Sequence, residues 1–392
     1  MRSLESLNVK GKTVFVRVDF NVPLNERGEI RNDTRIRATL PTINDLLEKG
    51  ARLVLASHLG RPKGKPDPKM SLWPVARRLG ELLGRDVLFA PDCVGEEVTR
   101  LKAGLQMGHI LLLENLRFHA QETANDQEFS RRLAEGIDSY VNDAFGSSHR
   151  AHASVVGITR FIPERAAGYL MKKEVDFLSR AIHDPAKPFV AILGGAKVED
   201  KIPVIENLLN KADDILIGGA MAYTFLKAQG YGVGKSLVEA DKFPTALSIL
   251  KKAEERCVRF RLPVDHVLTS SIECGTIVET VGTYPFPNDL MGVDIGPGTI
   301  ALFSEIIGRA KTIVWNGPLG VFETPAFAVG TMKIAEAVAN SGAFSIIGGG
   351  DSIAAVEKAG VGDKISHIST GGGASLEFLA YETLPGIQAL ED

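Results

Sequence analysis

The sequence predicts an α/β protein made of two doubly wound, Rossmann-like domains with parallel sheets, joined by a hinge. Its 392 residues exceed the size that one hydrophobic core usually supports, and a hydrophobic content of 44% is sufficient for two cores. Short apolar runs alternate with helical patterns along nearly the whole chain, as expected for parallel strands connected by helical crossovers. Several of these runs end in glycine-rich turns, which is where ligands bind in such sheets.

The expected strands are short runs of apolar residues, and the helices between them carry start signals. The clearest strands are 14–18, 53–56, 87–90, 110–113, 189–193, 215–217, 313–315 and 344–347. One helix is expected to begin at Pro41 and another directly after Ser71. Asn125 and Glu128 form a capping-box pattern, which predicts the start of a third helix.

One stretch of the chain suits a domain boundary. Residues 165–188 combine a helical middle with a proline-containing exit, as a linker would. We therefore expect one domain to span residues 1–168 and the other residues 169–377. The last helix, at about residues 378–392, is expected to cross back and pack on the first domain, because a second crossing makes a stiffer hinge than one linker.

Charge and cysteine content exclude several classes of partner. A net charge of -3 gives no general attraction to nucleic acid or to an anionic membrane, so we expect neither as a partner. Cys93, Cys257 and Cys274 are odd in number and far apart, which favours free thiols in a reducing compartment. The N-terminus lacks the apolar run of an export signal, and no segment approaches the length of a membrane-spanning helix. We expect a cytoplasmic protein.

The strongest functional signal is a glycine triplet at residues 348–350, between an expected strand and a helical pattern. Such a turn exposes backbone N–H groups at a helix N-terminus, where a phosphate binds, and it leaves Asp351 free to hold a metal. A single triplet is equally compatible with an ordinary tight turn capped by Ser352. The same pattern recurs at residues 193–197, 217–220 and 370–374, so the sequence predicts a large phosphate site at several strand ends.

The first half of the chain carries different chemistry at its strand ends. Its candidate residues are Arg17, Asp19, Asn21, His58, Arg61, Arg117, His119, His149, Arg150 and His152, with Arg35 just before a helix. Singly, each arginine suits an ion pair and each histidine a structural role. Together, several arginine forks on neighbouring strand ends match a small polyanion that bears both carboxylate and phosphate.

Two other functions and one decoy motif deserve comparison. A nicotinamide dehydrogenase would also be doubly wound, but the chain contains no G-x-G-x-x-G motif. A two-lobed solute-binding protein would explain the arginines, yet it would need an export signal and would not need Lys197 or Asp351. Residues 230–236 (GYGVGKS) nearly form a phosphate-binding loop, but Gln229 stands where its first glycine belongs and the preceding residues are helical.

Eight motifs, taken together, resemble the phosphoglycerate kinase family. In order, they read RVDFNVPL, SHLGRP, LLENLRFH, NDAFGSSHRAHAS, ILGGAKVEDKI, WNGPLGVFE, GGGDS and STGGGASLEFL, and they span about residues 14–379. The resemblance implies transfer of the acyl phosphate of 1,3-bisphosphoglycerate to MgADP, giving 3-phosphoglycerate and ATP, by a monomer with two hinged domains. The segment Leu379-Ala380-Tyr381-Glu382 departs from the family, which usually has a glycine and a lysine there.

The resemblance also assigns the site residues by matching position. The first domain would bind 3-phosphoglycerate through Asp19, Asn21, Arg35, His58, Leu59, Gly60, Arg61, Arg117 and Arg150. The second would bind ADP or ATP through Gly195, Ala196, Lys197, Lys201, Gly219, Gly292, Asn316, Gly317, Pro318, Glu323, Gly349, Gly350, Asp351 and Ser352. Without the resemblance, an ordinary exposed carboxylate remains an alternative for Glu323.

The expected chemistry needs positioned positive charge more than it needs a general base. Phosphoryl transfer spreads negative charge over the equatorial oxygens, and the attacking oxygen is already ionised. We expect Arg35 and Lys197 to stabilise that charge, with backbone donors at Gly349 and Gly372, while Asp351 holds the nucleotide-bound Mg²⁺.

Overall fold

The computed structural model describes residues 1–273 and 275–391. Cys93 and Cys257 are free thiols, as expected, whereas the same expectation for Cys274 lies outside the described residues. Within those residues, no helix has both the length and the apolar character needed to cross a membrane.

The chain divides into two compact units. Unit 1 holds Met1–Val175 and the C-terminal segment from Thr383, and unit 2 holds Asp176–Glu382. The chain therefore passes between the units twice, first within helix α6 (Tyr169–His183) and again after helix α13 (Gly373–Tyr381).

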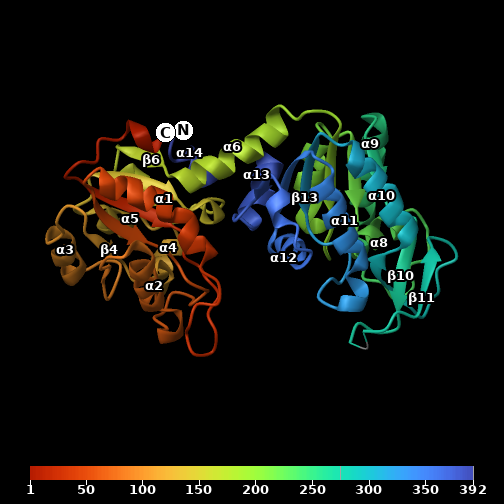
Figure 1. Ribbon diagram of the computed structural model, residues 1–392, viewed down its shortest axis with the longest axis horizontal. Helices are drawn as coiled ribbons and strands as arrows, with labels where there is room; N and C mark the ends of the chain where they lie inside the picture. Colours follow the sequence, from red (N-terminus) through yellow and green to blue (C-terminus); the bar gives the residue numbers. More distant parts are fainter. Residues whose placement is uncertain (274, 392) are drawn as a thin grey trace. The chain divides into compact units, whose positions relative to one another are not determined.

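Unit 1 is built on a six-stranded sheet in the order β3-β4-β2-β1-β5-β6, in which all neighbouring strands run parallel. Figure 1 labels two of these strands, β4 and β6, and the helices around them. The strands are β1 (Thr13–Val18), β2 (Arg52–Ala56), β3 (Leu88–Phe89), β4 (Ile110–Leu112), β5 (Ser139–Asp143) and β6 (Arg165–Ala167). The helices are α1 (Thr34–Glu48), α2 (Trp73–Leu83), α3 (Glu96–Ala103), α4 (Ala120–Thr123), α5 (Gln127–Ala134) and α14 (Pro385–Gln388). Every residue of β1 is buried, so this strand forms the centre of the core, against which α1 and α2 pack.

Unit 2 contains a second six-stranded parallel sheet, in the order β15-β14-β13-β7-β8-β9. Its strands are β7 (Phe189–Leu193), β8 (Asp214–Ile217), β9 (Arg259–Arg261), β13 (Thr312–Asn316), β14 (Phe344–Gly348) and β15 (His367–Ile368). The strand order reverses at the β7–β13 pair, and right-handed crossovers then place helices on both faces. The predicted fold class, two α/β domains with parallel sheets, is confirmed.

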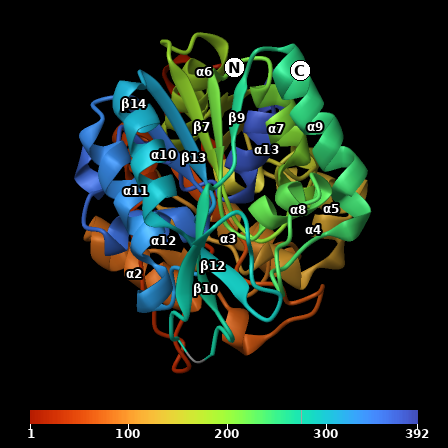
Figure 2. The same ribbon diagram turned by 90° about the vertical axis from the view of Figure 1, so that its right-hand side faces the viewer.

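Helices cover both faces of this second sheet (Figure 2). One face carries α7 (Ile202–Leu208), α8 (Met221–Ala228) and α9 (Phe243–Glu255), and the other carries α10 (Pro297–Arg309), α11 (Val329–Asn340) and α12 (Gly350–Lys358). Trp315, the fourth of the five residues of β13, is fully buried in the core that the sheet forms with these helices.

Unit 2 also contains a small antiparallel sheet that was not predicted. It has the order β11-β10-β12, with β10 (Asp265–Thr269), β11 (Glu279–Gly282) and β12 (Met291–Ile295). Three of the four residues of β11 are exposed, so this edge strand has little of the apolar pattern by which strands are recognised.

Helix starts differ from the sequence-based expectations in two places. Helix α1 begins at Thr34, seven residues before the expected start, and Pro41 lies inside it. Helix α5 is capped by Asp126, whose side chain accepts a hydrogen bond from Phe129 N, in place of the expected Asn125. Asn125 adopts φ = 53°, which is unlike the extended backbone of a helix cap.

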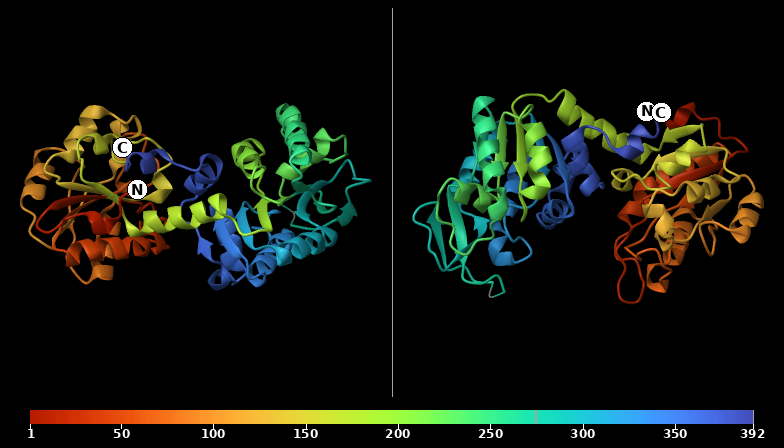
Figure 3. Two further views of the ribbon diagram at one scale, coloured as in Figure 1. Left: turned by 90° about the horizontal axis from the view of Figure 1, so that it is seen from above. Right: turned by 180° about the vertical axis from the view of Figure 1, so that it is seen from behind.

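The C-terminal segment contains two helices instead of the single one expected at about residues 378–392. Helix α13 ends at Tyr381 in unit 2, and the short helix α14 belongs to unit 1, where Gly386 N donates to Ser148 O at 2.8 Å. The two ends of the chain lie side by side on unit 1 (Figure 3), where the Met1 amino group contacts Glu391 Oε1 at 3.1 Å.

Candidate active site

The strand ends of unit 2 surround a cavity of about 520 Å³. It lies where β7, β13 and β14 end and the turn before α13 begins. Its lining includes Gly195, Ala196, Lys197, Lys201, Asn316, Gly317, Pro318, Gly349, Gly350, Asp351, Ser352 and Gly372. The structure therefore brings together in one cavity three of the four glycine turns singled out in the sequence.

A second cavity of about 240 Å³ adjoins the first and receives the fourth glycine turn. Both cavities are lined by Gly195, Ala196, Pro318 and Asp351, and the second adds Gly219, Gly292 and Glu323. Tyr223 and Asp294 also line it, and sequence inspection did not single them out, because neither belongs to a recognisable motif.

Close backbone contacts explain why these turns require glycine. A Cβ atom on Gly194 would lie 2.1 Å from Pro318 O, and Gly195 N donates to that same oxygen at 2.9 Å. Gly349, the residue before α12, has φ = 91°, a conformation that side chains disfavour. The turns after β7 and β13 are thus packed backbone to backbone, and they line the cavity with peptide groups.

The hydroxyl of Ser352 has a structural partner. Ser352 is fully buried, and its Oγ accepts a hydrogen bond from Gly317 N at 2.6 Å. It therefore joins the first turn of α12 to the turn after β13, and the cap of α12 is Gly349.

Lysine and aspartate supply the charges of this cavity. Lys197 and Asp351 are exposed, whereas Lys201 is half-buried and its Nζ contacts Asn316 Oδ1. Burial lowers the pKa of Lys201 to about 8, although Asp200 and Asp351 oppose this shift. A helix N-terminus and two lysines make the cavity suitable for phosphate oxygens.

Unit 1 gathers the arginines at the carboxyl ends of β1, β2, β4 and β5. Arg35 Nη1 contacts Asp19 Oδ2 at 2.8 Å. Asn21 Oδ1 accepts from Gly60 N at 2.9 Å, and Gly60 O accepts from Arg117 Nη1, also at 2.9 Å. Residues from β1, β2 and β4 are therefore linked directly, as the sequence predicted for neighbouring strand ends.

The remaining candidates of unit 1 differ in their surroundings. Arg61 follows Gly60 and is exposed, as is Arg150, whose Nε donates to His149 Nε2 at 3.1 Å. His119 is paired with a carboxylate that was not among the candidates: its Nε2 lies 2.5 Å from Asp92 Oδ1. Leu59 is buried, and its carbonyl accepts from Asn115 Nδ2.

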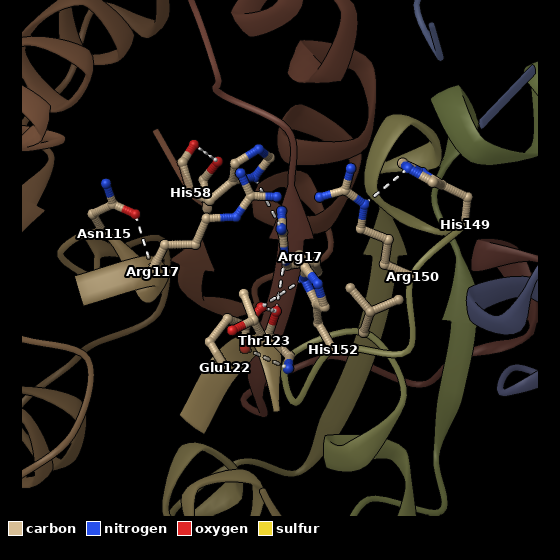
Figure 4. A network of polar contacts seen from close by, with 12 residues as sticks. Arg17, His58, Asn115, Arg117, Glu122, Thr123, His149, Arg150 and His152 are labelled. Carbon is tan, nitrogen blue, oxygen red and sulfur yellow. Dashed lines mark hydrogen bonds and ion pairs between the residues drawn. The ribbon is translucent and has the colours of Figure 1, made fainter. Parts of the chain in front are cut away.

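Arg17, Arg117 and Arg150, with His58 beside them, form an arginine cluster. Burial and mutual repulsion shift the pKa values of Arg117 and His58. Burial lowers the pKa of Arg117 to about 10, with Arg17 and Arg150 adding to the shift. Burial also lowers the pKa of His58 well below its usual range, so its imidazole is neutral at pH 7. The cluster is closely spaced positive charge (Figure 4), which an anionic ligand would stabilise.

Two buried residues that were not predicted complete this cluster. Glu122 and Ser154 are fully buried and hydrogen-bonded to each other, and Ser154 also contacts Arg17. They are 32 positions apart in the chain and belong to no charge pattern, so only the fold shows that they are neighbours.

Comparison with known proteins identifies the family. The family model described as phosphoglycerate kinase matches residues 4–382. The chain is 61% identical to a phosphoglycerate kinase of Acidobacterium capsulatum, covering 100% of this chain and 99% of the relative. It is 59% identical to one of Koribacter versatilis, covering 99% and 98%, respectively.

Solved structures agree with the sequence comparison. The structure of phosphoglycerate kinase from Coxiella burnetii has a TM-score of 0.90 at 42% identity, covering 100% of this chain and 98% of that chain. The corresponding structure from Pyrococcus horikoshii has a TM-score of 0.86 at 38% identity, with the same coverage. With full-length relatives at this level of identity, the chain belongs to the phosphoglycerate kinase family and is a phosphotransferase.

Proposed function

We propose that this protein catalyses the reversible transfer of the acyl phosphate of 1,3-bisphosphoglycerate to MgADP, giving 3-phosphoglycerate and MgATP, as a step of glycolysis. The observation that carries the proposal is the cavity of about 520 Å³ in unit 2, where glycine turns and two lysines meet at one sheet edge. Peptide N–H groups and ammonium groups at fixed positions are what a transferring phosphoryl group needs. We further expect a cytoplasmic monomer.

The nucleotide would occupy both cavities of unit 2. Its phosphates fit the larger cavity with Lys197, Lys201 and the N-terminus of α12, because these groups carry positive charge or free N–H donors. Its base and ribose fit the smaller one, which Gly292 lines and where Glu323 offers a carboxylate to the ribose hydroxyls.

Asp351 is the proposed magnesium ligand. Its exposed carboxylate lies at the junction of the two cavities, and oxygen donors of this kind are preferred by Mg²⁺. The metal, when bound with the nucleotide, would neutralise phosphate charge. Asp351 also keeps a negative charge near Lys201, which opposes the loss of that ammonium's proton.

The three-carbon substrate would bind to unit 1. The proposed contacts are Asp19, Asn21, Arg35, His58, Leu59, Gly60, Arg61, Arg117 and Arg150. Arginines bind both carboxylate and phosphate, and Asp19 and Asn21 are suited to a hydroxyl group. In the transition state, Arg35 and Lys197 would stabilise the charge on the moving phosphoryl group, together with backbone N–H groups at Gly349 and Gly372.

A coupled assay tests this function directly. The purified protein is mixed with 1,3-bisphosphoglycerate, ADP and Mg²⁺, and ATP is followed through a second enzyme. We expect turnover that depends on all three additions. Binding of 3-phosphoglycerate without any ATP formation would instead favour a binding protein and contradict the proposal.

A further inference from the structure

Glu122 is a buried carboxylate beside the arginine cluster. It lies on α4, is fully buried, and cannot touch a ligand in solvent. Each of its carboxylate oxygens accepts a hydrogen bond from Ser154: Oε1 from the hydroxyl at 2.6 Å and Oε2 from the backbone N–H at 2.9 Å. His152 Nδ1 lies 3.8 Å from Oε1.

The hydroxyl of Ser154 links Glu122 to Arg17. The hydroxyl has a single proton, and that proton points to Glu122, so the lone pairs of Oγ are left to accept. Arg17 Nε donates to them at 2.9 Å. Arg17 is fully buried, and its Nη1 donates to Val18 O, so the guanidinium is held on two sides.

The third guanidinium nitrogen of Arg17, Nη2, determines the tautomer of His58. Arg17 Nη2 lies 3.2 Å from His58 Nδ1, and because a guanidinium can only donate, Nδ1 must accept. The proton of the neutral imidazole is therefore on Nε2, which makes Nε2 a donor. Figure 4 shows this chain of contacts from Glu122 through Arg17 to His58, with Arg117 and Arg150 alongside.

We propose that Glu122 is a positioning residue of the substrate site: through Ser154 it orients Arg17, which fixes His58 as the tautomer that donates from Nε2. A neutral imidazole with a fixed N–H donor contributes a directed hydrogen bond to an oxygen of the bound anion. This inference rests on the proposed function, because it assigns His58 to the site for 3-phosphoglycerate.

A simpler role for Glu122 would be that of a counter-charge for Arg17 and Arg117. The two roles predict opposite results. Removing only a negative charge should strengthen anion binding, whereas disturbing the orientation should weaken it. Removing the Ser154 hydroxyl keeps the charge and breaks the chain, so it separates the two roles.

The variant Glu122→Gln keeps the shape of the side chain but replaces one carboxylate oxygen, which accepts a hydrogen bond, by an NH₂ group, which donates. In one orientation of the amide, its NH₂ group faces Ser154 N–H. In the other orientation, it donates to Ser154 Oγ, and the hydroxyl proton loses its acceptor on residue 122. Either orientation removes one of the two hydrogen bonds that hold Ser154, so we expect Ser154 to shift and Arg17 to shift with it.

The test measures 3-phosphoglycerate binding by calorimetry and the His58 tautomer by nitrogen NMR of the imidazole ring. We expect Glu122→Gln and Ser154→Ala each to weaken binding about tenfold and to populate the other tautomer, while ADP binding to unit 2 stays the same. The double variant should be no weaker than either single one, because both break one chain. Asp143→Asn, which alters a buried carboxylate at the end of β5, is the matched control and should change neither measurement.

Three results would overturn the inference. One is an unchanged tautomer and unchanged affinity in Ser154→Ala. Another is tighter binding in Glu122→Gln with normal binding in Ser154→Ala, which would make Glu122 a counter-charge only. If the unaltered protein does not bind 3-phosphoglycerate at all, the proposed function itself fails, and the inference fails with it.

Discussion

Three arginines of unit 1 are held in different ways, and this suggests different roles. Arg17 is fully buried, with each of its guanidinium nitrogens in contact with another group. Arg117 is partly buried and bonded to Gly60 O. Arg35 has one ion pair, to Asp19, and 35% of its side chain is exposed, so most of its donors are free to reach a reacting group. This makes Arg35 the best candidate for transition-state stabilisation.

Arg35→Ala should therefore lower kcat about 100-fold and change the affinity for 3-phosphoglycerate much less, since removing one donor to the transition state costs roughly this factor. Turnover is measured by the coupled assay and affinity by calorimetry. Arg37→Ala is the control, because Arg37 lies on the same helix in an exposed ion pair with Asp33. A loss of affinity that explains the whole loss of rate would make Arg35 a binding residue only.

Lys201 should make nucleotide binding sensitive to pH. Burial lowers its pKa to about 8 in the free protein, and a bound phosphate should raise it again, because the negative charge stabilises the ammonium. At about pH 9 the free amine is mostly neutral, so ADP binding should take up a proton, whereas at about pH 6 Lys201 is already protonated and contributes no uptake.

Calorimetry in two buffers with different heats of ionisation measures this uptake. Lys201→Arg keeps the charge at both pH values, so the uptake at high pH should disappear in that variant. Equal proton uptake in the original protein and in Lys201→Arg would show that another group is responsible.

At the scale of elements, the turns after β7 and β13 depend on each other. A Cβ atom on Gly194 would meet Pro318 O at 2.1 Å and Gly317 O at 2.8 Å, and both of these are backbone atoms that cannot rotate away. Because these turns line the larger cavity, a shift in one of them should disturb the nucleotide site as well as the packing.

Gly194→Ala should lower the free energy of unfolding by about 1–3 kcal/mol and weaken ADP binding, since overpacking at a rigid contact costs about this much. Gly308→Ala is the matched control: this glycine is in helix α10, a Cβ atom there meets nothing within 4 Å, and the change should stabilise by about 0.5–1 kcal/mol. Denaturant unfolding and calorimetry measure the two effects. Normal ADP affinity in Gly194→Ala would show that the turn after β7 does not shape the nucleotide site.

The elements differ in how well the sequence predicted them, for physical reasons. Strands such as β1 and β13 are buried on both faces, so their apolar runs are unambiguous. Helix starts depend on local backbone geometry: Asn125 matches a capping pattern, but its positive φ leaves the cap to Asp126. In the site, glycine turns and arginines stand out as residue types, whereas the contact between Glu122 and Ser154 arises only when the chain folds.

At the scale of the whole molecule, each unit has its own parallel sheet and its own candidate site. The arginines and Asp19 belong to unit 1, and both cavities lined by glycine turns belong to unit 2. The chain passes between the units at α6 and again after α13, so two connections would have to accommodate any relative movement. We expect the proposed function to use such a movement, because its two substrates would bind to different units.

Phosphoryl transfer requires the attacking oxygen to lie in line with the leaving oxygen and about 3–3.5 Å from the phosphorus, with stray water excluded. We therefore expect the radius of gyration to fall most when 3-phosphoglycerate and MgADP are both present. This pair cannot react, so small-angle scattering can follow it at equilibrium. Each ligand alone serves as a control and should give a smaller change, because it engages only one unit. If the mixture of both scatters like the free protein while turnover is normal, the two substrates do not bind on separate units, and the assignment of the arginine cluster to 3-phosphoglycerate is wrong.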